Sequence, residues 1–578
     1  MTQRLFFRSL AVGILVLLLI GIAGCNRLFA KSPLNLTSSY GQPTAAIFVS
    51  RTSPVMVSLL VNPENLEVLE GDGELSKLKT RLFANTGIDY QHDIQPWLGN
   101  EITLAVTHLD IDRDPANGQQ PGYLMVLATQ QPEQSREFVE VLFSKRTLAG
   151  RNLTVEQYKG VKLIYDTLQE ETPKEEKRGG YYSTPNRQSK SKNSQPNIQS
   201  TLAGASVGKN FVLFANDPRV LRDAINNVQA VELNLTNSNK YQQAIKQLPQ
   251  NALAVAFLNL PQVIKWQGLG TDAQTYESQI VSFVEQPQGL LAESVLLTQD
   301  EFLPPSIQLS NPVGALQYLP SEVSFAVSSS DLSRLDNSNL AVLWRQVTAT
   351  IFSSEKNVFS QLFLPLADAE KSWGINWKED IFSWVQGEYA IGLLPREDKP
   401  LPDWIFVAEK SDSTPAAIYR LDAIASSNGL SRNSLTLDDQ KIFAWTELNT
   451  TPTTSPLTKD RELFTIQAKV LGTYTEVGNY EIFASSIEAM NRALTAKENS
   501  LVNNSSFQEG IAVLPQTNQG YVYLDWTNSQ ELLERQLPVL KLVEVIGKPF
   551  FQNLRSLTVS SYGSNVEMLK GGVFFQFN

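Results

Sequence analysis

The chain has 578 residues, of which 42% are hydrophobic and 19% charged, and its formal net charge is −11. One hydrophobic core stops growing at about 250–300 residues, so a chain of this length predicts at least two units. Because the net charge is negative and no Lys/Arg cluster with interleaved aromatic residues occurs, the sequence argues against a nucleic-acid-binding surface.

The N-terminus has the pattern of an export signal. Arg4 and Arg8 precede the apolar residues 11–24, and the four residues that end at Cys25, IAGC, resemble a bacterial lipobox. The apolar stretch is short against the roughly 20 residues that span a bilayer as a helix. We therefore expect a signal peptide, residues 1–24, whose cleavage leaves Cys25 lipidated and the body tethered to a membrane on its extracytoplasmic side. The alternative is an uncleaved signal anchor in which Cys25 has no role.

Residues 25–43 are rich in Ser, Pro and Asn, which predicts a flexible tether. The strand-like stretches 45–50 (AAIFVS) and 55–61 (VMVSLLV) follow, and a stretch that begins at Ala315 is their counterpart later in the chain. As Cys25 is the only cysteine, the body has no internal disulfide and must be held together by packing.

Residues 87–101, GIDYQHDIQPWLGNE, return as GINWKEDIFSWVQGE at 374–388, with six of fifteen positions identical. Each copy predicts a helix of about two turns that ends near Gly99 or Gly387 and then leads into a strand. The shared residues include two carboxylates and two tryptophans, namely Asp93, Trp97, Asp380 and Trp384. We expect the carboxylates to stabilise helix starts and the tryptophans to anchor the core. The alternative is that the tryptophans line a groove that holds a ligand or peptide.

Two further blocks match in the same order, residues 206–225 with 476–494 and 241–258 with 507–524. Three collinear matches predict two tandem α+β copies, residues 44–310 and 311–578. Strands joined by short turns dominate each copy, so we expect a mainly antiparallel sheet with packed helices. Residues 168–200 are polar and charged and predict a disordered insert in the first copy.

The Gly-Ile…Asp-Ile…Trp block resembles a domain family of unknown function found in exported cyanobacterial proteins. The resemblance covers nearly the whole mature chain. It implies an α+β fold and membrane attachment in a cyanobacterial envelope or thylakoid, hence a periplasmic or lumenal body. It implies no catalytic residue.

Residues that carry chemistry are scarce. His92 and His108 are the only histidines, and no nucleophile with a histidine base is evident. Residues 110–114, DIDRD, are similar to the start of a calcium loop, but Pro115 stands where that loop has glycine. Residues 204–210, GASVGKN, are one residue too short for a phosphate-binding loop. We therefore expect no metal and no cofactor.

The sequence thus favours a membrane-tethered binding or scaffold protein that is not an enzyme and has a protein partner. Two alternatives stay open. A carrier of an apolar ligand or lipid requires a large apolar cavity between sheet and helices. A carboxylate-based hydrolase requires two carboxylates with shifted pKa values in one cleft.

Overall fold

The computed structural model describes residues 42–61, 90–114, 116, 118–148, 150–167, 201–267, 276–298, 308–333, 338–344, 374–396, 401–453, 463–530 and 548–577. The predicted signal peptide, Cys25, nearly all of the tether and the insert 168–200 lie outside these residues. Within the described residues, no helix is both long enough and apolar enough to cross a bilayer.

The first half of the chain, up to residue 298, contributes ten strands and four α-helices to the described structure. They are β1 (Val55–Leu59), β2 (Leu98–His108), β3 (Gly122–Thr129), α4 (Pro132–Leu148), β4 (Asn152–Tyr158), β5 (Val161–Thr167), β6 (Ala203–Val207), β7 (Phe211–Ala215), α5 (Pro218–Gln229), α6 (Asn239–Ile245), β8 (Ala254–Asn259), α7 (Leu260–Gln267), β9 (Tyr276–Gln286) and β10 (Gly289–Thr298).

The second half, from residue 308, also contributes ten strands, with the main helices at corresponding places. Its elements are β11 (Phe325–Ser330), β12 (Glu388–Leu394), β13 (Asp403–Glu409), α11 (Thr414–Ser427), β14 (Ser431–Leu437), β15 (Gln440–Thr453), β16 (Leu463–Val477), β17 (Tyr480–Ala484), α12 (Ile487–Thr495), α13 (Ser505–Val513), β18 (Tyr521–Asp525), α16 (Lys548–Asn553), β19 (Leu554–Ser561) and β20 (Met568–Phe577).

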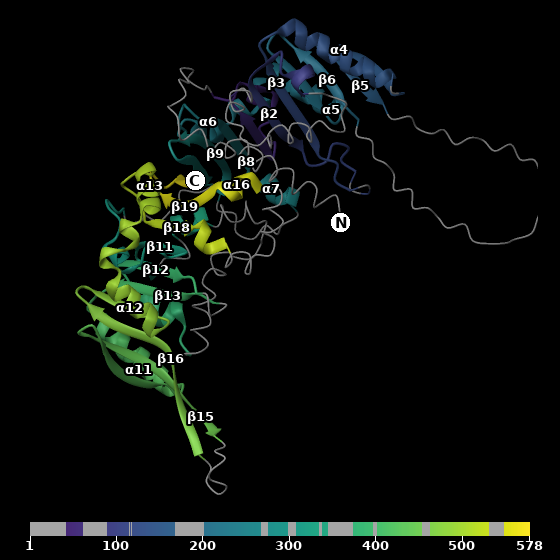
Figure 1. The fold of residues 1–578 in the computed structure, drawn as a ribbon. Helices are drawn as coiled ribbons and strands as arrows, with labels where there is room; N and C mark the ends of the chain where they lie inside the picture. The colour runs from purple at the N-terminus through teal and green to yellow at the C-terminus, as the bar shows by residue number, and fades with distance from the viewer. Residues whose placement is uncertain are drawn as a thin grey trace, which may run out of the picture.

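All twenty described strands form one open, antiparallel sheet that runs through both halves (Figure 1). The pairings give the order β4-β5-β6-β7-β3-β2-β1-β8-β9-β10-β20-β19-β18-β11-β12-β13-β17-β16-β15-β14. The predicted α+β class with a mainly antiparallel sheet is confirmed. Each pairing within the first half has a counterpart within the second half, between strands numbered ten higher.

The two halves meet where β10 pairs with β20. This ladder runs from Gly289 opposite Gln576 to Leu297 opposite Met568, and its central pair is Glu293 with Gly572. Each of these two residues also lies opposite a serine of the preceding strand in its own half. An approximate two-fold axis through the central pair therefore relates the strands on either side.

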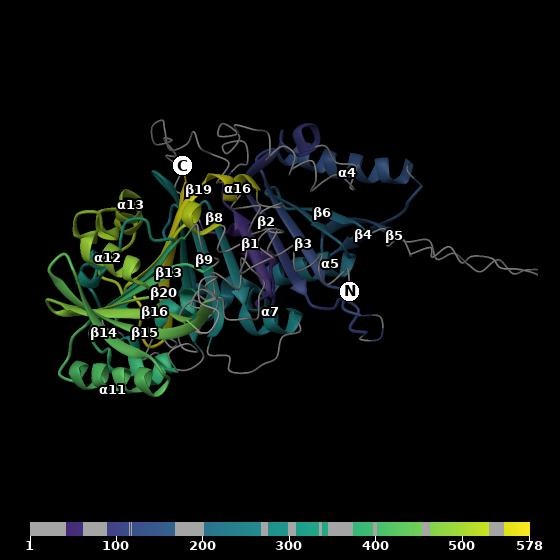
Figure 2. The same cartoon turned by 60° about the horizontal axis from the view of Figure 1, so that its bottom comes forward.

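Helices cover both faces of the sheet, so the fold has three layers. In β7, Leu213 packs with α5 and α6, whereas its neighbours Val212 and Phe214 pack with α4 on the other face. In β17, Ile482 packs with α12 and Phe483 with α11 in the same way. Figure 2 shows α12 and α11 on opposite sides of these strands.

Three local expectations are wrong. Residues 45–50 were expected to form a strand, but Thr44–Phe48 is a 3-10 turn whose first N–H groups donate to the buried carboxylate of Glu101. Gly99 and Gly387 do not end helices, and neither has a positive φ. A Cβ on Gly99 would lie 3.2 Å from the Ala128 carbonyl oxygen, so close approach of β2 to β3 favours glycine there.

The expected two-turn helix in each Trp-bearing motif is also wrong. Tyr90–Ile94 and Trp377–Ile381 form single π-helical turns, and the second is followed by the 3-10 turn Phe382–Trp384. The indole N–H of Trp97 donates to the Asp93 carbonyl oxygen, which a regular α-helix would offer to the backbone N–H of Trp97. That N–H donates to the Ile94 oxygen instead. The tryptophan side chain thus interrupts the helix that its own sequence pattern predicts.

A substitution at the join tests how tightly the halves fit. A Cβ on Gly289 would overlap the carbonyl oxygen of Phe575 in β20. We expect Gly289→Ala to lower the free energy of unfolding by about 1–3 kcal/mol, because backbone must move to relieve the overlap. Gly99→Ala, where the nearest atom is 3.2 Å away, should cost less. Equal urea midpoints for Gly289→Ala and the wild type would show that the join is looser than described.

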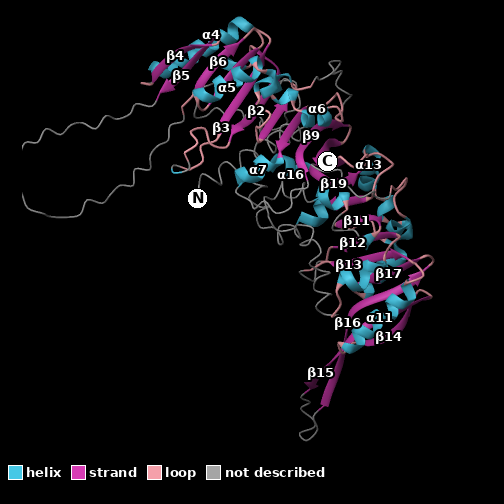
Figure 3. Cartoon of the chain, turned by 180° about the vertical axis from the view of Figure 1, so that it is seen from behind, coloured by secondary structure: helices cyan, strands magenta, loops and turns pink. Residues whose placement is uncertain are grey.

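The strands β15 and β16 extend beyond the rest of the sheet as a two-stranded ribbon (Figures 1 and 3). The last residue of β15 paired with β14 is Thr446. The pairing of β15 with β16 shifts register between Trp445 and Thr446 and then continues to Thr453 opposite Leu463. The described part of the first half has no such extension.

Candidate functional site

The shared tryptophans lie in the protein interior. Trp97 is 2% exposed and Trp384 is 8% exposed. Each indole N–H donates to the carbonyl oxygen four residues earlier, at 2.7 Å to Asp93 and 3.1 Å to Asp380. Both rings are therefore buried, and Trp97 packs 5.5 Å from the ring of Phe138 in α4.

The shared carboxylates hold these turns against a helix on the same face. The Asp380 carboxylate accepts the backbone N–H of Asn376 at 2.8 Å and also the guanidinium of Arg420 in α11. Asn376 caps the turn by accepting the Glu379 N–H at 3.1 Å. In the first half, Asp93 lies 3.7 Å from the ammonium of Lys145 in α4. Both aspartates therefore join the Trp-bearing turn to the helix that follows β3 or β13.

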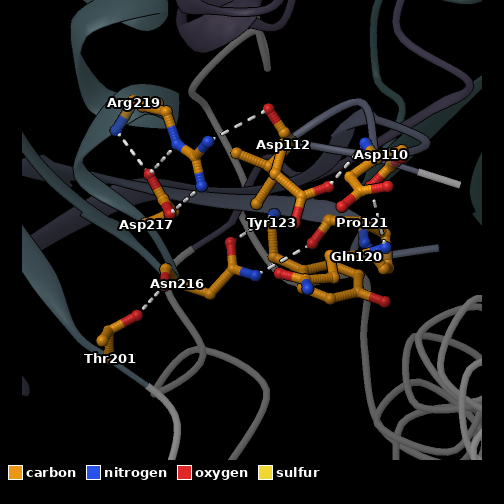
Figure 4. Close-up of polar contacts among 11 residues, drawn as sticks. Asp110, Asp112, Gln120, Pro121, Tyr123, Thr201, Asn216, Asp217 and Arg219 are labelled. Carbon is orange, nitrogen blue, oxygen red and sulfur yellow. Dashed lines mark hydrogen bonds and ion pairs between the residues drawn. The ribbon is translucent and has the colours of Figure 1, made fainter. Parts of the chain in front are cut away.

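One polar end of the first half is formed by the loop between β2 and β3 and by the start of α5 (Figure 4). Asn216, just after β7, accepts the backbone N–H of Tyr123 at 2.8 Å and donates to the Pro121 carbonyl at 2.9 Å. In the second half, Ser485 accepts the N–H of Trp404 at 3.0 Å in the same way. The polar residue after β7 or β17 thus fixes the loop to the neighbouring strand in both halves.

Next in the chain, Asp217 caps α5 and accepts the backbone N–H of Arg219 at 2.8 Å, with Pro218 at the first position of the helix. Its carboxylate also accepts two guanidinium N–H groups of Arg219, whose third contact is the Ile111 carbonyl at 3.4 Å (Figure 4). These contacts attach the loop to the helix start.

Residues 110–114, which are similar in sequence to the start of a calcium loop, form a turn in which carboxylates accept backbone N–H groups. Asp110 accepts from Gln120 at 3.2 Å, and Asp112 accepts from Asp114 at 3.0 Å. Among the described residues, no three His, Cys, Asp or Glu side chains are grouped so that they could hold a metal ion. Carboxylates used in this way order the turn itself.

A contact that the sequence does not reveal is a line of three side chains at the end of β2. The Thr107 hydroxyl lies 3.0 Å from His108 Nδ1, and His108 Nε2 lies 3.4 Å from a carboxylate oxygen of Asp223 in α5. Burial lowers the pKa of His108, although Asp223 opposes that shift. A nucleophile must be reachable by its substrate, but Thr107 is only 7% exposed and lies 3.4 Å from the Gly122 carbonyl that it bonds. The arrangement therefore favours a structural contact over acyl transfer.

The two remaining sequence candidates also have simple structural settings. His92 lies exposed in the π-helical turn Tyr90–Ile94. The stretch 204–210 runs through β6 into the tight turn before β7, with Gly208 at φ +62°. It is a β-hairpin and does not begin a helix, which is the element that a phosphate-binding loop requires.

Three carboxyl groups of the described residues have a raised pKa, in each case mainly through burial: Glu285, Glu481 and Asp525. They lie on β9, β17 and β18, and four strand-to-strand steps separate each from the next in the sheet order. At about 4.8 Å per step, neighbouring members are on the order of 19 Å apart. They do not converge in one cleft as the hydrolase alternative requires.

Comparison with solved structures gives weak likenesses, among them two crystal forms of TP0453. Crystal form I of TP0453 matches with 9% identity and a TM-score of 0.24, over 44% of this chain and 78% of that one. Crystal form III matches with 8% identity and a TM-score of 0.24, over 46% of this chain and 84% of that one. Scores this low support no inference about fold or function.

No curated protein matches the chain. A family model described as "Protein of unknown function (DUF3352)" matches residues 10–577, which is nearly the entire sequence. The chain therefore belongs to the DUF3352 family.

Proposed function

We propose that this protein is a membrane-tethered, extracytoplasmic binding or scaffold protein without enzymatic activity, built from two tandem copies of one α+β unit. The copies would be residues 44–310 and 311–578. The main support for this proposal is that the strands pair in the same order in the two halves, with β10 and β20 paired about an approximate two-fold axis. Such a sheet presents two similar surfaces in a fixed relation, which suits a partner with two related sites or two copies of a partner.

The setting of the reactive groups supports a role without catalysis. Thr107 of the Thr107–His108–Asp223 contact is buried, so a substrate cannot reach its hydroxyl. The carboxyl groups with raised pKa values are four strands apart in the sheet. The polar loop of Figure 4 is ordered by contacts within the protein. Ordered polar loops of this kind are suited to contact with another macromolecule.

The proposed location rests on the N-terminal sequence. A cleaved lipoprotein signal would leave Cys25 acylated, with a short tether before the first described residues. If the membrane is cyanobacterial, as the sequence resemblance implies, the body would lie in the periplasm or the thylakoid lumen. Tethering restricts the search for a membrane partner to the plane of the membrane.

Replacement of Cys25 tests the anchor. We expect Cys25→Ser to abolish acyl labelling and to leave the precursor uncleaved, because the thiol that is acylated before cleavage is missing. The measurement is labelling with a radioactive fatty acid, with gel mobility as the second readout. Unchanged labelling and mobility would refute lipidation.

Co-purification from membranes tests the proposed function. Membranes solubilised in a mild detergent should yield the tagged protein with one or more protein partners at a fixed ratio. Recovery of the protein as a monomer with no partner, at several detergent concentrations, would contradict the binding role. Recovery with bound lipid alone would favour the carrier alternative.

A further inference from the structure

The pairing of β16 with β17 differs in charge from its counterpart in the first half. Glu476 of β16 lies directly opposite Glu481 of β17. At the corresponding place in the first half, Ser206 lies opposite Val212. Like charges directly opposite each other in an antiparallel pair destabilise that pair, so the second half carries an unfavourable contact that the first half lacks.

The two carboxyl groups are in unlike surroundings. Glu481 is 5% exposed and lies beside Ala408 of β13, whereas the side chain of Glu476 is 66% exposed and forms an ion pair with Lys410. Burial raises the pKa of Glu481 to about 7, the charge of Glu476 adds to that shift, and Lys410 opposes it. Glu481 is therefore the member of the pair that takes up a proton near neutral pH.

No other charged group of the described neighbouring elements contributes to that shift. On the face of β17 that carries Glu481, the neighbours Phe406 and Phe483 are apolar and stack at 5.6 Å. The helix α12 packs on the opposite face, through Ala489 and Met490. The helix α11 packs with Phe483 on the face of Glu481 and carries Asp422, whose carboxylate pairs with Arg432 of β14 at 3.0 Å. The charges that act on Glu481 are thus Glu476 from β16 and Lys410, the residue after β13.

We propose that the pairing of β16 with β17 is a proton-dependent lock, which closes when the Glu476–Glu481 pair binds one proton and loosens when both side chains are ionised. The pair lies beside the turn that joins β16 to β17, at the end of β16 away from the projecting ribbon. The pairing of β16 with β17 would then respond to the acidity of its compartment, whereas the corresponding pairing of β6 with β7, which has no carboxylate pair, would not. This inference is independent of the proposed binding role.

The direction of the response follows from the pKa of Glu481. The folded value of about 7 lies above the ordinary value of 4.5, so between these pH values the folded state holds a proton that the unfolded state has released. Stability therefore falls as pH rises through this window and is constant above it. A difference of about 2.5 pKa units corresponds to roughly a 300-fold change in the opening equilibrium.

Hydrogen exchange of the full chain tests the lock, with the first half as an internal reference. The readout is the protection of the β16–β17 amides divided by that of the β6–β7 amides, at pH 5 and pH 8.5. We expect this ratio to fall at least about 30-fold at the higher pH in the wild type. In Glu481→Gln, which is neutral at both pH values, the ratio should stay constant.

Two controls keep the test decisive. Glu488→Gln removes a carboxylate whose side chain is 69% exposed and should leave the wild-type response intact. Glu476→Gln removes the opposing charge but leaves Glu481 buried, so its response should be smaller than that of the wild type. A constant ratio in the wild type would overturn the proposal, as would an equal response in Glu481→Gln.

Discussion

Replacing Trp97 by alanine is expected to lower the free energy of unfolding by about 3–5 kcal/mol, the usual cost of deleting a buried aromatic side chain. The indole is 2% exposed, packs 5.5 Å from the ring of Phe138 in α4, and donates its N–H to the Asp93 carbonyl at 2.7 Å. Alanine would leave a cavity between the turn and α4 and would release that carbonyl. Urea unfolding monitored by circular dichroism measures the change.

Matched variants separate packing from hydrogen bonding. Trp97→Phe keeps an aromatic ring but loses the donor, and we expect it to cost less than Trp97→Ala. Trp384 has the same contact in the second half, with its N–H 3.1 Å from the Asp380 carbonyl, so Trp384→Ala should fall in the same range. A cost below about 1 kcal/mol for both alanine variants would refute the anchoring role.

Replacing Asp166 by alanine should have an effect of similar size, about 3–5 kcal/mol, because it leaves a buried charge without its partner. The Asp166 side chain is 1% exposed and pairs with Arg146 of α4, which is 15% exposed. It also accepts the backbone N–H of Leu202 at 2.6 Å. The substitution would therefore separate α4 from β5 and leave a backbone donor of the neighbouring strand without its acceptor.

An exposed ion pair between the same two elements provides the control. Lys162 of β5 lies 2.9 Å from Glu140 of α4, and their side chains are 50% and 62% exposed. Because solvent screens such a pair, Glu140→Ala should cost less than about 1 kcal/mol. Similar denaturation midpoints for Asp166→Ala and Glu140→Ala would contradict the account of the buried pair.

The sequence predicts the class of the fold because its strands alternate and its helices carry clear caps. Asp217 before Pro218 marks the start of α5, and Asn376 marks the start of the second Trp-bearing turn. It does not predict the π-helical form of that turn. Periodicity places Trp97 and Trp384 on a buried face, but it does not show that their indole N–H groups compete with the backbone for the same carbonyl oxygens.

The contacts that define the polar end are harder to predict. His108 and Asp223 are 115 positions apart, and only the packing of α5 beside the end of β2 brings them to 3.4 Å. Asp166 and Arg146 are polar residues near segment ends and carry no pattern that marks them as partners. The join of β10 to β20 is likewise a matter of tertiary structure, because either strand reads as an ordinary antiparallel strand.

The two halves form one sheet only if β10 pairs with β20. A disulfide between Ala292→Cys and Val573→Cys tests it, in a Cys25→Ser background that has no other thiol. Opposite residues in an antiparallel pair have Cα atoms about 4.5–5.5 Å apart, which a disulfide can bridge. The account predicts rapid crosslinking within one chain, and none when Ala292→Cys is combined with Phe577→Cys, about four residues out of register. Crosslinking of the second pair, or failure of the first in folded protein, would contradict it.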